Sequence, residues 1–249
     1  MKNLAYLFLV LVSCTFSFNS YAGNAEEYVS SYAKLLEKYV HVKQKQSIET
    51  SLVDYRLWST DPLHEDSMNK ILKVNPDVFS GKEKMAFWIN AYNLLTIDLI
   101  IKTGEKQSIK NQGSFFKNVW KSHNWNIGGK EYTLDEIEHE ILRPMGEPKI
   151  HMAINCASLS CPDLRNEPYI AEKLNNQLDE QTKLFLNNND KGVRFASGGM
   201  QLSKIFRWFS DDFGGDEGVV GFISRNYKGD IINSEIDEYI DYNWSLNSK

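Results

Sequence analysis

The chain has 249 residues, of which 42% are hydrophobic and 24% charged, and its formal net charge is -5 at pH 7. This length suits one compact domain that can bury a full core, and the composition is ordinary for a globular protein. The mild acidity, without a cluster of Lys and Arg on any one predicted helix or strand, argues against nucleic acid as a partner.

The first 22 residues have the pattern of a signal peptide. A short positive start is followed by an apolar run from Leu4 to Phe18 and by small residues before a cleavage site at Ala22. The run is shorter than the roughly 20 residues that a spanning helix needs. We therefore predict a periplasmic or secreted protein, residues 23–249, with no membrane span after cleavage. A second interpretation is a lipoprotein anchored at Cys14, because Leu11–Cys14 resembles a lipoprotein cleavage box.

Apolar periodicity and capping signals divide the mature chain into helices and short hairpins. Helices are predicted over Asn24–Lys45, from Asp61 through Ile71, and over Gly81–Ile101, Thr133–Arg143, Tyr169–Asn187 and Asp216–Tyr227, with a short one after Ser203. Hairpins are predicted at Trp125–Tyr132 and Val193–Leu202, and a closing strand at Glu238–Leu246. This irregular order favours a single α+β domain with a central apolar helix and a small, mostly antiparallel sheet.

Gly81–Ile101 is the strongest predicted helix, because it is apolar on almost all sides, as a helix in the centre of a domain is. Glu83, Asn90 and Asn93 interrupt it, and their spacing puts them on one face. Buried amides and carboxylates need hydrogen-bond partners. We expect this supporting face to pack beneath the Cys-containing loop and hold it; the alternative is a network with a purely structural role.

Lys149–Pro162, with the sequence KIHMAINCASLSCP, is the stretch in which chemistry is expected. It contains His151 and the two cysteines that remain after signal cleavage, Cys156 and Cys161. If residues 150–155 form a strand, His151 and Cys156 face opposite ways and lie about 16 Å apart along it. These two residues are then poorly placed as a pair for nucleophilic catalysis.

Cys161 is better placed for catalysis. The loop after Cys156 can turn back toward His151, and Pro162 suits the first position of a helix that Cys161 would cap. A thiol at a helix N-terminus ionises more easily than an ordinary one. Asn155 shares the predicted face of His151, so it could orient the imidazole or help to hold an oxyanion.

Glu138 and His139 are supporting candidates on the helix that the capping box Thr133–Glu136 opens. His139 offers Cys156 a second possible imidazole partner. A lone helical histidine is more often packed or solvated than catalytic, so His139 carries little weight by itself.

Four separated blocks carry most of these candidates: Ala86–Asn93 (AFWINAYN), Glu136–Arg143, His151–Pro162 and Ser203–Trp208 (SKIFRW). With these blocks in this order, the chain resembles the domain of unknown function 547 family over about residues 70 to 210. The family carries no settled activity, so the resemblance implies where to look and names no reaction. A distant likeness to the papain and transglutaminase group of thiol enzymes is fold analogy only, since a packed helix precedes a His-bearing strand.

Three functions remain open. The first is a thiol-dependent hydrolase or transferase that uses Cys161 or Cys156 with His151. The second is a non-catalytic exported binding or scaffold domain with a Cys156–Cys161 disulfide, which oxidising conditions favour. The third is a metal site made by His151, the two cysteines and either His139 or Glu138, although this spacing is not that of a familiar zinc site.

The sequence has no Gly-rich phosphate loop, no serine nucleophile elbow and no two-metal carboxylate cluster. We therefore expect no cofactor. The partner is an unidentified small molecule or peptide.

Overall fold

Helix α4, Gly81–Thr103, passes through the larger hydrophobic core of the molecule. Every residue from Met85 to Ile100 is buried, which confirms the prediction of a central apolar helix. Gly104 ends the helix in the left-handed conformation, with φ at 64°, and its N–H donates to carbonyl oxygens of the last turn.

The computed structural model describes residues 27–114, 118–196, 199–229, 231 and 235–249. The predicted signal peptide and the alternative lipid anchor at Cys14 lie outside these residues. In the described part of the chain, no helix is long and apolar enough to cross a membrane.

Most of the remaining helices are short. A first helix covers residues 27–39. The others are α2 (Tyr55–Trp58), α3 (Pro62–Ile71), α5 (Val119–Ser122), α6 (Leu134–Glu136), α7 (Leu174–Leu186), α8 (Lys204–Trp208), α9 (Ser210–Phe213) and α10 (Gly215–Asn226). A π-helix, η3 (Ile137–Leu142), continues α6, and 3-10 turns occur at η1 (Pro76–Val78), η2 (Ile109–Gln112), η4 (Arg143–Met145) and η5 (Pro148–Met152).

The described strands pair in three small sheets. Two are antiparallel hairpins, β1 (Val40–Lys45) with β2 (Ile48–Val53) and β3 (Asn124–Ile127) with β4 (Lys130–Thr133). In the third, β5 (Val193–Ala196) pairs antiparallel with β6 (Gly199–Ser203), and β6 pairs parallel with β7 (Ile236–Ile240). The α+β class and the mostly antiparallel pairing are confirmed, but three sheets replace the single one that the sequence predicts.

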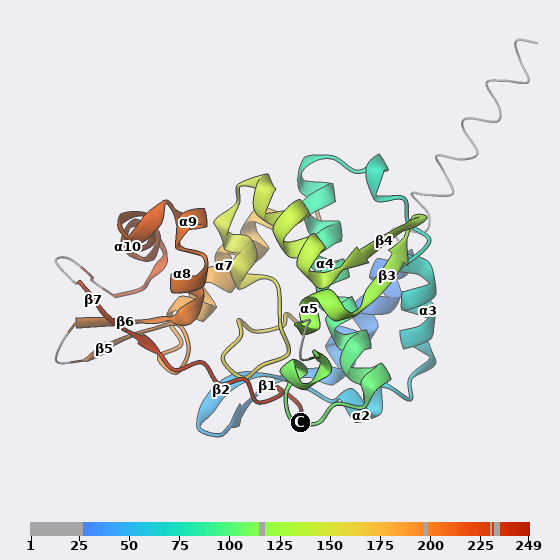
Figure 1. The fold of residues 1–249 in the computed structure, drawn as a ribbon, viewed down its shortest axis with the longest axis horizontal. Helices are drawn as coiled ribbons and strands as arrows, with labels where there is room; N and C mark the ends of the chain where they lie inside the picture. Colours follow the sequence, from blue (N-terminus) through green and yellow to red (C-terminus); the bar gives the residue numbers. More distant parts are fainter. Residues whose placement is uncertain (1–26, 115–117, 197–198, 230, 232–234) are drawn as a thin grey trace, which may run out of the picture.

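The apolar core has two parts. The larger surrounds α4 and includes residues of the first helix, the β3–β4 hairpin and α7. The smaller lies among α7, α10 and the β5–β6–β7 sheet. Figure 1 shows this C-terminal part, in orange and red, at one end of the molecule and α4 in the other half. Helix α7 contributes apolar side chains to both parts and so joins them.

The β3–β4 hairpin confirms the tight turn predicted from its Gly pair. Gly128 and Gly129 both have positive φ, 60° and 93°, as a primed turn requires. A Cβ atom on Gly128 would also lie 2.7 Å from the carbonyl oxygen of Val74, so only glycine fits there.

The first helix is shorter than its predicted range of Asn24–Lys45. It ends at residue 39, and β1 begins at Val40. The inward apolar spacing stops at Tyr39, and Gln46 and Ser47 then adopt positive φ values of 51° and 65° that turn the chain into β2. The helix prediction is wrong beyond residue 39 because this local turn overrides weak helical propensity.

Asn90 ties α4 to the segment that precedes α7. Its Nδ2 donates to the carbonyl oxygen of Tyr169 (2.7 Å), and its Oδ1 accepts from the N–H of the same residue (2.9 Å). Asn90 and Tyr169 are both buried. The side chain therefore satisfies two backbone groups that no helix or strand pairs.

Replacing Asn90 by Ala should lower the free energy of unfolding by about 2–4 kcal/mol, because two buried backbone groups of Tyr169 lose their partners. Chemical denaturation followed by Trp fluorescence measures this value. Asn176→Ala, at an exposed position of α7, is the matched control and should change stability by less than about 0.5 kcal/mol. Equal stabilities for the two variants would contradict the buried role of Asn90.

Candidate functional site

A cavity of about 290 Å³ lies where several segments of the chain meet. Helix α4, the π-helix η3, the turn η5, the loop that follows η5 and the aromatic side chains of α8 and the C-terminal segment line it. Five of the predicted candidates share its wall: Glu138, His139, His151, Cys156 and Cys161. The structure thus brings together residues from all four sequence blocks, because Tyr92 and Trp208 also line the cavity.

The segment that carries His151 is not a strand. Pro148–Met152 form the 3-10 turn η5, and the residues from 153 to 155 belong to no strand. Pro148 stands at the start of the turn, and the side chain of Glu147 accepts from the N–H of Lys149. A short apolar run does not distinguish a strand from a buried helical turn, so the predicted strand, with His151 and Cys156 on opposite faces, is wrong.

No helix begins at Pro162, because α7 begins only at Leu174. The expectation that Cys161 caps a helix is therefore wrong, and the predicted start of this helix at Tyr169 is too early. Residues 153–173 instead form an irregular, mostly buried loop, which we call the Cys loop.

Asn93 on α4 holds the Cys loop from one side. Its Nδ2 donates to the carbonyl oxygen of Ala153 (3.0 Å), and its Oδ1 accepts from the N–H of Asn155 (2.7 Å). The side chain of Asn155 accepts from the N–H of Ala157 (2.8 Å) and donates to the carbonyl oxygen of Pro162 (2.7 Å). Asn93 therefore holds the loop by hydrogen bonds, as predicted. The side-chain amide of Asn155 bonds to backbone groups of the loop itself and not to His151.

Glu83, the third member of the predicted supporting face, is exposed. It lies in the first turn of α4, before the helix enters the core at Met85. The buried polar face therefore contains Asn90 and Asn93 but not Glu83.

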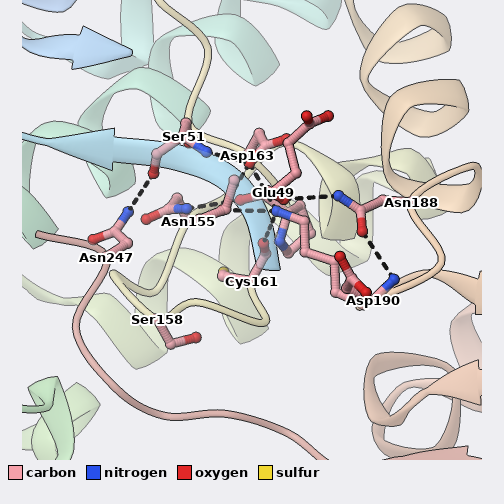
Figure 2. Close-up of polar contacts among 12 residues, drawn as sticks. Glu49, Ser51, Asn155, Ser158, Cys161, Asp163, Asn188, Asp190 and Asn247 are labelled. Atoms are coloured by element: carbon pink, nitrogen blue, oxygen red, sulfur yellow. Dashed lines mark hydrogen bonds and ion pairs between the residues drawn. The ribbon is translucent and has the colours of Figure 1, made fainter. Parts of the chain in front are cut away.

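A buried ion pair holds the Cys loop from the other side. Lys191, only 1% exposed, donates through Nζ to the carbonyl oxygen of Cys161 (3.1 Å) and to Asp163 Oδ1 (2.7 Å). The same carboxylate oxygen accepts from the N–H of Ser51 in β2 (2.6 Å). Figure 2 shows Ser51 next to Asp163, with Cys161 nearby. No sequence pattern indicates it, because a Lys in the polar stretch 187–191 is typical of a solvated turn.

The C-terminal segment covers the Cys loop. The N–H of Leu159 donates to the carbonyl oxygen of Ser245 (2.9 Å), and the N–H of Asn247 donates to that of Ala157 (3.0 Å). Sequence alternation predicts a strand over Glu238–Leu246, but β7 ends at Ile240. The prediction is wrong beyond Ile240 because the chain leaves the sheet there to run along the loop.

The two cysteines are reduced, buried and in contact. Their sulfurs lie 3.0 Å apart, and the N–H of Cys156 donates to Cys161 Sγ (2.9 Å). Two hydroxyls also reach Cys156 Sγ, Ser158 Oγ at 3.2 Å and the hydroxyl of Tyr242 at 3.3 Å. Cys156 therefore lies at the centre of a cluster of hydrogen-bond donors.

This cluster makes the two thiols chemically unequal. Burial alone would raise the pKa of Cys156, but hydrogen bonds from Cys161, Ser158 and Tyr242 outweigh burial and lower the pKa to about 7. Burial and the charge of Cys156 raise the pKa of Cys161 well above its usual value. Cys156 is therefore the thiol that ionises, and Cys161 stays protonated and donates to it.

His151 is fixed by a carboxylate and not by a sulfur. Its Nε2 lies 2.7 Å from Asp212 Oδ2, and Arg143 holds Asp212 through two bonds of 2.6 and 2.7 Å. The imidazole stacks on Phe209, with ring centroids 4.1 Å apart. Burial lowers the pKa of His151 to about 4, although Asp212 opposes this shift, so the ring is neutral at pH 7.

Arg143 also donates to His139 Nδ1 (2.9 Å), so one network joins His139, Arg143, Asp212 and His151. Sequence reasoning missed Asp212 and the role of Arg143. They are 69 positions apart, and no local spacing pattern connects residues at such a separation. The sequence offered one signal for such a residue: a candidate histidine that is buried is expected to pair with a carboxylate.

Among the described residues, no group of three or more His, Cys, Asp or Glu side chains is arranged to hold a metal ion. His151 is turned to Asp212, and the two sulfurs are turned to each other. The geometry therefore gives no support to the metal-site alternative.

The family described as Protein of unknown function, DUF547, matches residues 76–186. Over this segment the chain is similar to the DUF547 family. The match confirms the resemblance carried by the sequence blocks, and it ends before the Ser203–Trp208 block. No curated protein and no solved structure matches the chain. The DUF547 segment supplies α4, η3, η5 and the whole Cys loop. Asp212 and the aromatic residues Trp208, Tyr242 and Trp244 lie beyond it.

The contribution of His151 to stability should fall as the pH falls from about 6.5 to 4. The pKa of His151 is about 4 in the folded chain against a usual value of 6.5, so this side chain binds more protons in the unfolded chain in this window. Glu138, whose pKa is raised to about 7, acts in the opposite direction. One such group contributes at most about 1.4 kcal/mol per pH unit.

His151→Gln should remove this contribution, so the unfolding free energy of the variant should fall less, or rise more, than that of the wild type as the pH falls from about 6.5 to 4, whatever its stability at pH 7. Chemical denaturation at several pH values measures the two slopes. All other titrating groups are common to both proteins, so equal slopes would contradict a buried neutral His151.

Proposed function

We propose that this DUF547 protein is an exported thiol-dependent hydrolase or acyltransferase with Cys156 as its nucleophile. One observation carries the proposal: the Cys156 sulfur lines the cavity, and hydrogen bonds lower its pKa to about 7 despite burial. The thiolate and not the thiol is the nucleophile. With this pKa, about half of Cys156 is ionised at neutral pH.

The chemistry that suits this site is acyl transfer through a thioester. The thiolate attacks the carbonyl carbon of an ester or amide and displaces the leaving group, and water or another acceptor then attacks the thioester. The hydroxyls of Ser158 and Tyr242, 3.2 and 3.3 Å from Cys156 Sγ, are close enough to donate to the oxygen that becomes negative during attack.

His151 supplies a second polar group on the cavity wall. Asp212 occupies its Nε2, which leaves Nδ1 as the ring nitrogen for a substrate. Because the pKa of His151 is about 4, this nitrogen accepts a hydrogen bond at neutral pH, from a substrate N–H or from an incoming water.

The aromatic wall favours a neutral substrate with a flat or apolar part. Trp120, Trp208, Tyr242 and Trp244 form a chain of ring contacts with centroids between 4.6 and 5.8 Å apart. Trp208 is 45% exposed. None of the described residues that line the cavity is Lys or Arg, so an anionic group finds no cationic partner there. Uncharged esters and peptide amides are the acyl donors that suit this wall.

A second candidate function is a non-catalytic exported binding domain. The sulfurs of Cys156 and Cys161 are 3.0 Å apart, so a small movement brings them to disulfide distance, which oxidising compartments favour. Thiol titration of unreduced protein separates the two functions. Two free thiols support the enzyme, and none supports the stapled binding domain.

Cys156→Ala should lower kcat/KM for p-nitrophenyl acetate by about 10³-fold or more, because the nucleophile is lost. Mass spectrometry of the wild type should place the acetyl group on Cys156. Asn176→Ala, exposed on α7, controls for handling and should match the wild type. An acetyl group on any other side chain, or full activity in Cys156→Ala, would show that Cys156 is not the nucleophile.

Full-length protein expressed in a bacterium with a periplasm should be recovered there with Gly23 as its first residue, because we propose cleavage after Ala22. N-terminal sequencing measures this. Ala22→Arg removes the small residue that signal peptidase requires and should leave the precursor uncut. A lipid-modified Cys14 at the N-terminus would establish the lipoprotein alternative, and an intact Met1 would contradict export.

A further inference from the structure

Glu138 is a buried carboxyl group that forms no salt bridge with any residue that the structure describes. It is 7% exposed and lines the cavity together with Cys156. Its hydrogen-bond partner in the described part of the chain is the hydroxyl of Tyr92, which donates to Oε2 at 3.1 Å. Arg143, on the next turn, is turned away to Asp212 and His139. A buried carboxylate that lacks a counter-ion opposes folding, which marks Glu138 as a candidate for function.

The local backbone supports this assignment. Glu138 lies in the π-helix η3, which follows the capping box of α6 directly. Such π-helices are rare and occur frequently at functional sites. In η3 the wider turn places both Glu138 and His139 on the cavity wall.

The groups that influence the pKa of Glu138 come from three parts of the chain. Tyr92 belongs to α4, Cys156 to the Cys loop, and Asp135 and Arg143 to the same helical segment as Glu138. Burial is the largest influence and raises the pKa of Glu138, as do Cys156 and Asp135, whereas Tyr92 and Arg143 lower it. The resulting pKa is about 7.

Two groups on the cavity wall compete for the role of proton carrier, and their acidity decides between them. A proton moves most readily between groups of matched pKa, and a general base works best with a pKa near the working pH. Glu138 and Cys156 both have a pKa of about 7, whereas His151 has a pKa of about 4. Transfer from Cys156 to His151 is therefore less favourable at equilibrium than transfer to Glu138.

We infer that Glu138 is the catalytic group that accepts the proton of Cys156 and returns it to the leaving group. This inference rests on the thiol chemistry proposed above and assigns the proton to a carboxylate in place of the predicted imidazole. Both groups line one cavity of about 290 Å³, which is large enough to hold a water molecule, so the proton passes directly or through one water.

The steps balance as follows. The Cys156 thiol gives its proton to the Glu138 carboxylate, and the thiolate forms a bond to the acyl carbon. The bond between that carbon and the leaving group breaks, and neutral Glu138 protonates the departing alcohol or amine. Glu138 then takes a proton from water as the water attacks the thioester, the C–S bond breaks, and the proton returns to Cys156.

Glu138→Gln tests this inference with p-nitrophenyl acetate as the probe. Nitrophenolate leaves without protonation, so the initial burst that reports acylation of Cys156 should persist. Deacylation needs a base for water and should slow by about 10²-fold or more. Acetylated Cys156 should then accumulate in the mass spectrum of the variant but not of the wild type.

A second measurement, labelling of Cys156 by iodoacetamide as a function of pH, needs no turnover. Loss of the carboxylate removes a negative neighbour, so labelling in Glu138→Gln should shift to lower pH by about 0.5–1 unit. Glu140→Gln is the matched control, because Glu140 is exposed on the same helix. It should change neither deacylation nor labelling.

The outcomes are distinguishable. Deacylation at the wild-type rate in Glu138→Gln, with loss of deacylation in His151→Gln, would overturn the inference in favour of the imidazole. Unchanged labelling in Glu138→Gln would also overturn it, because the two groups would then not interact. A wild type that never acylates would contradict the proposed function itself, and the labelling shift would still report the pairing of Cys156 with Glu138.

Discussion

The Cys loop runs through the interior of the molecule without being a helix or a strand, and the rest of the structure depends on this constraint. Each buried backbone N–H and C=O of such a loop needs a partner. Asn90 and Asn93 of α4 supply some of these partners. Lys191, in the turn before β5, and the backbone of the C-terminal segment supply others. Elements that are far apart in sequence are thus tied together by one irregular loop.

Burial of this loop also determines the acidity of the side chains around the cavity. In water these side chains would keep their usual pKa values. In the interior, neighbouring charges and hydrogen bonds shift the pKa of each group more strongly, because less solvent screens them. Cys156 becomes more acidic because donors surround its sulfur, and Cys161, one contact away, becomes less acidic. The same burial makes Glu138 a weaker acid and His151 a weaker base. A carboxyl group is thereby brought into the range that imidazole usually occupies.

The features of the fold that sequence predicts are those encoded by local patterns. The apolar run of α4, the Gly128–Gly129 turn and the capping box at Thr133 each act within a few residues, and each is present. The turn η5 resembles a strand in sequence, because a short run of mixed apolar and polar residues fits either state. The pairs Arg143–Asp212 and Lys191–Asp163 join distant segments, and a single sequence contains no pattern that links them.

The contact between the sulfurs of Cys156 and Cys161 is compatible with both proposed functions, the thiol enzyme and the disulfide-bonded binding domain. Cys161 lowers the pKa of Cys156 by donating to its sulfur, and for that it must be close enough to form a disulfide as well. Oxidation would remove the nucleophile and its donor together. Cys156 and Cys161 are only 9% and 2% exposed, so an oxidant must reach Cys156 through the cavity that a substrate would fill. In the proposed thiol enzyme, an occupied cavity would therefore shield the pair from such an oxidant.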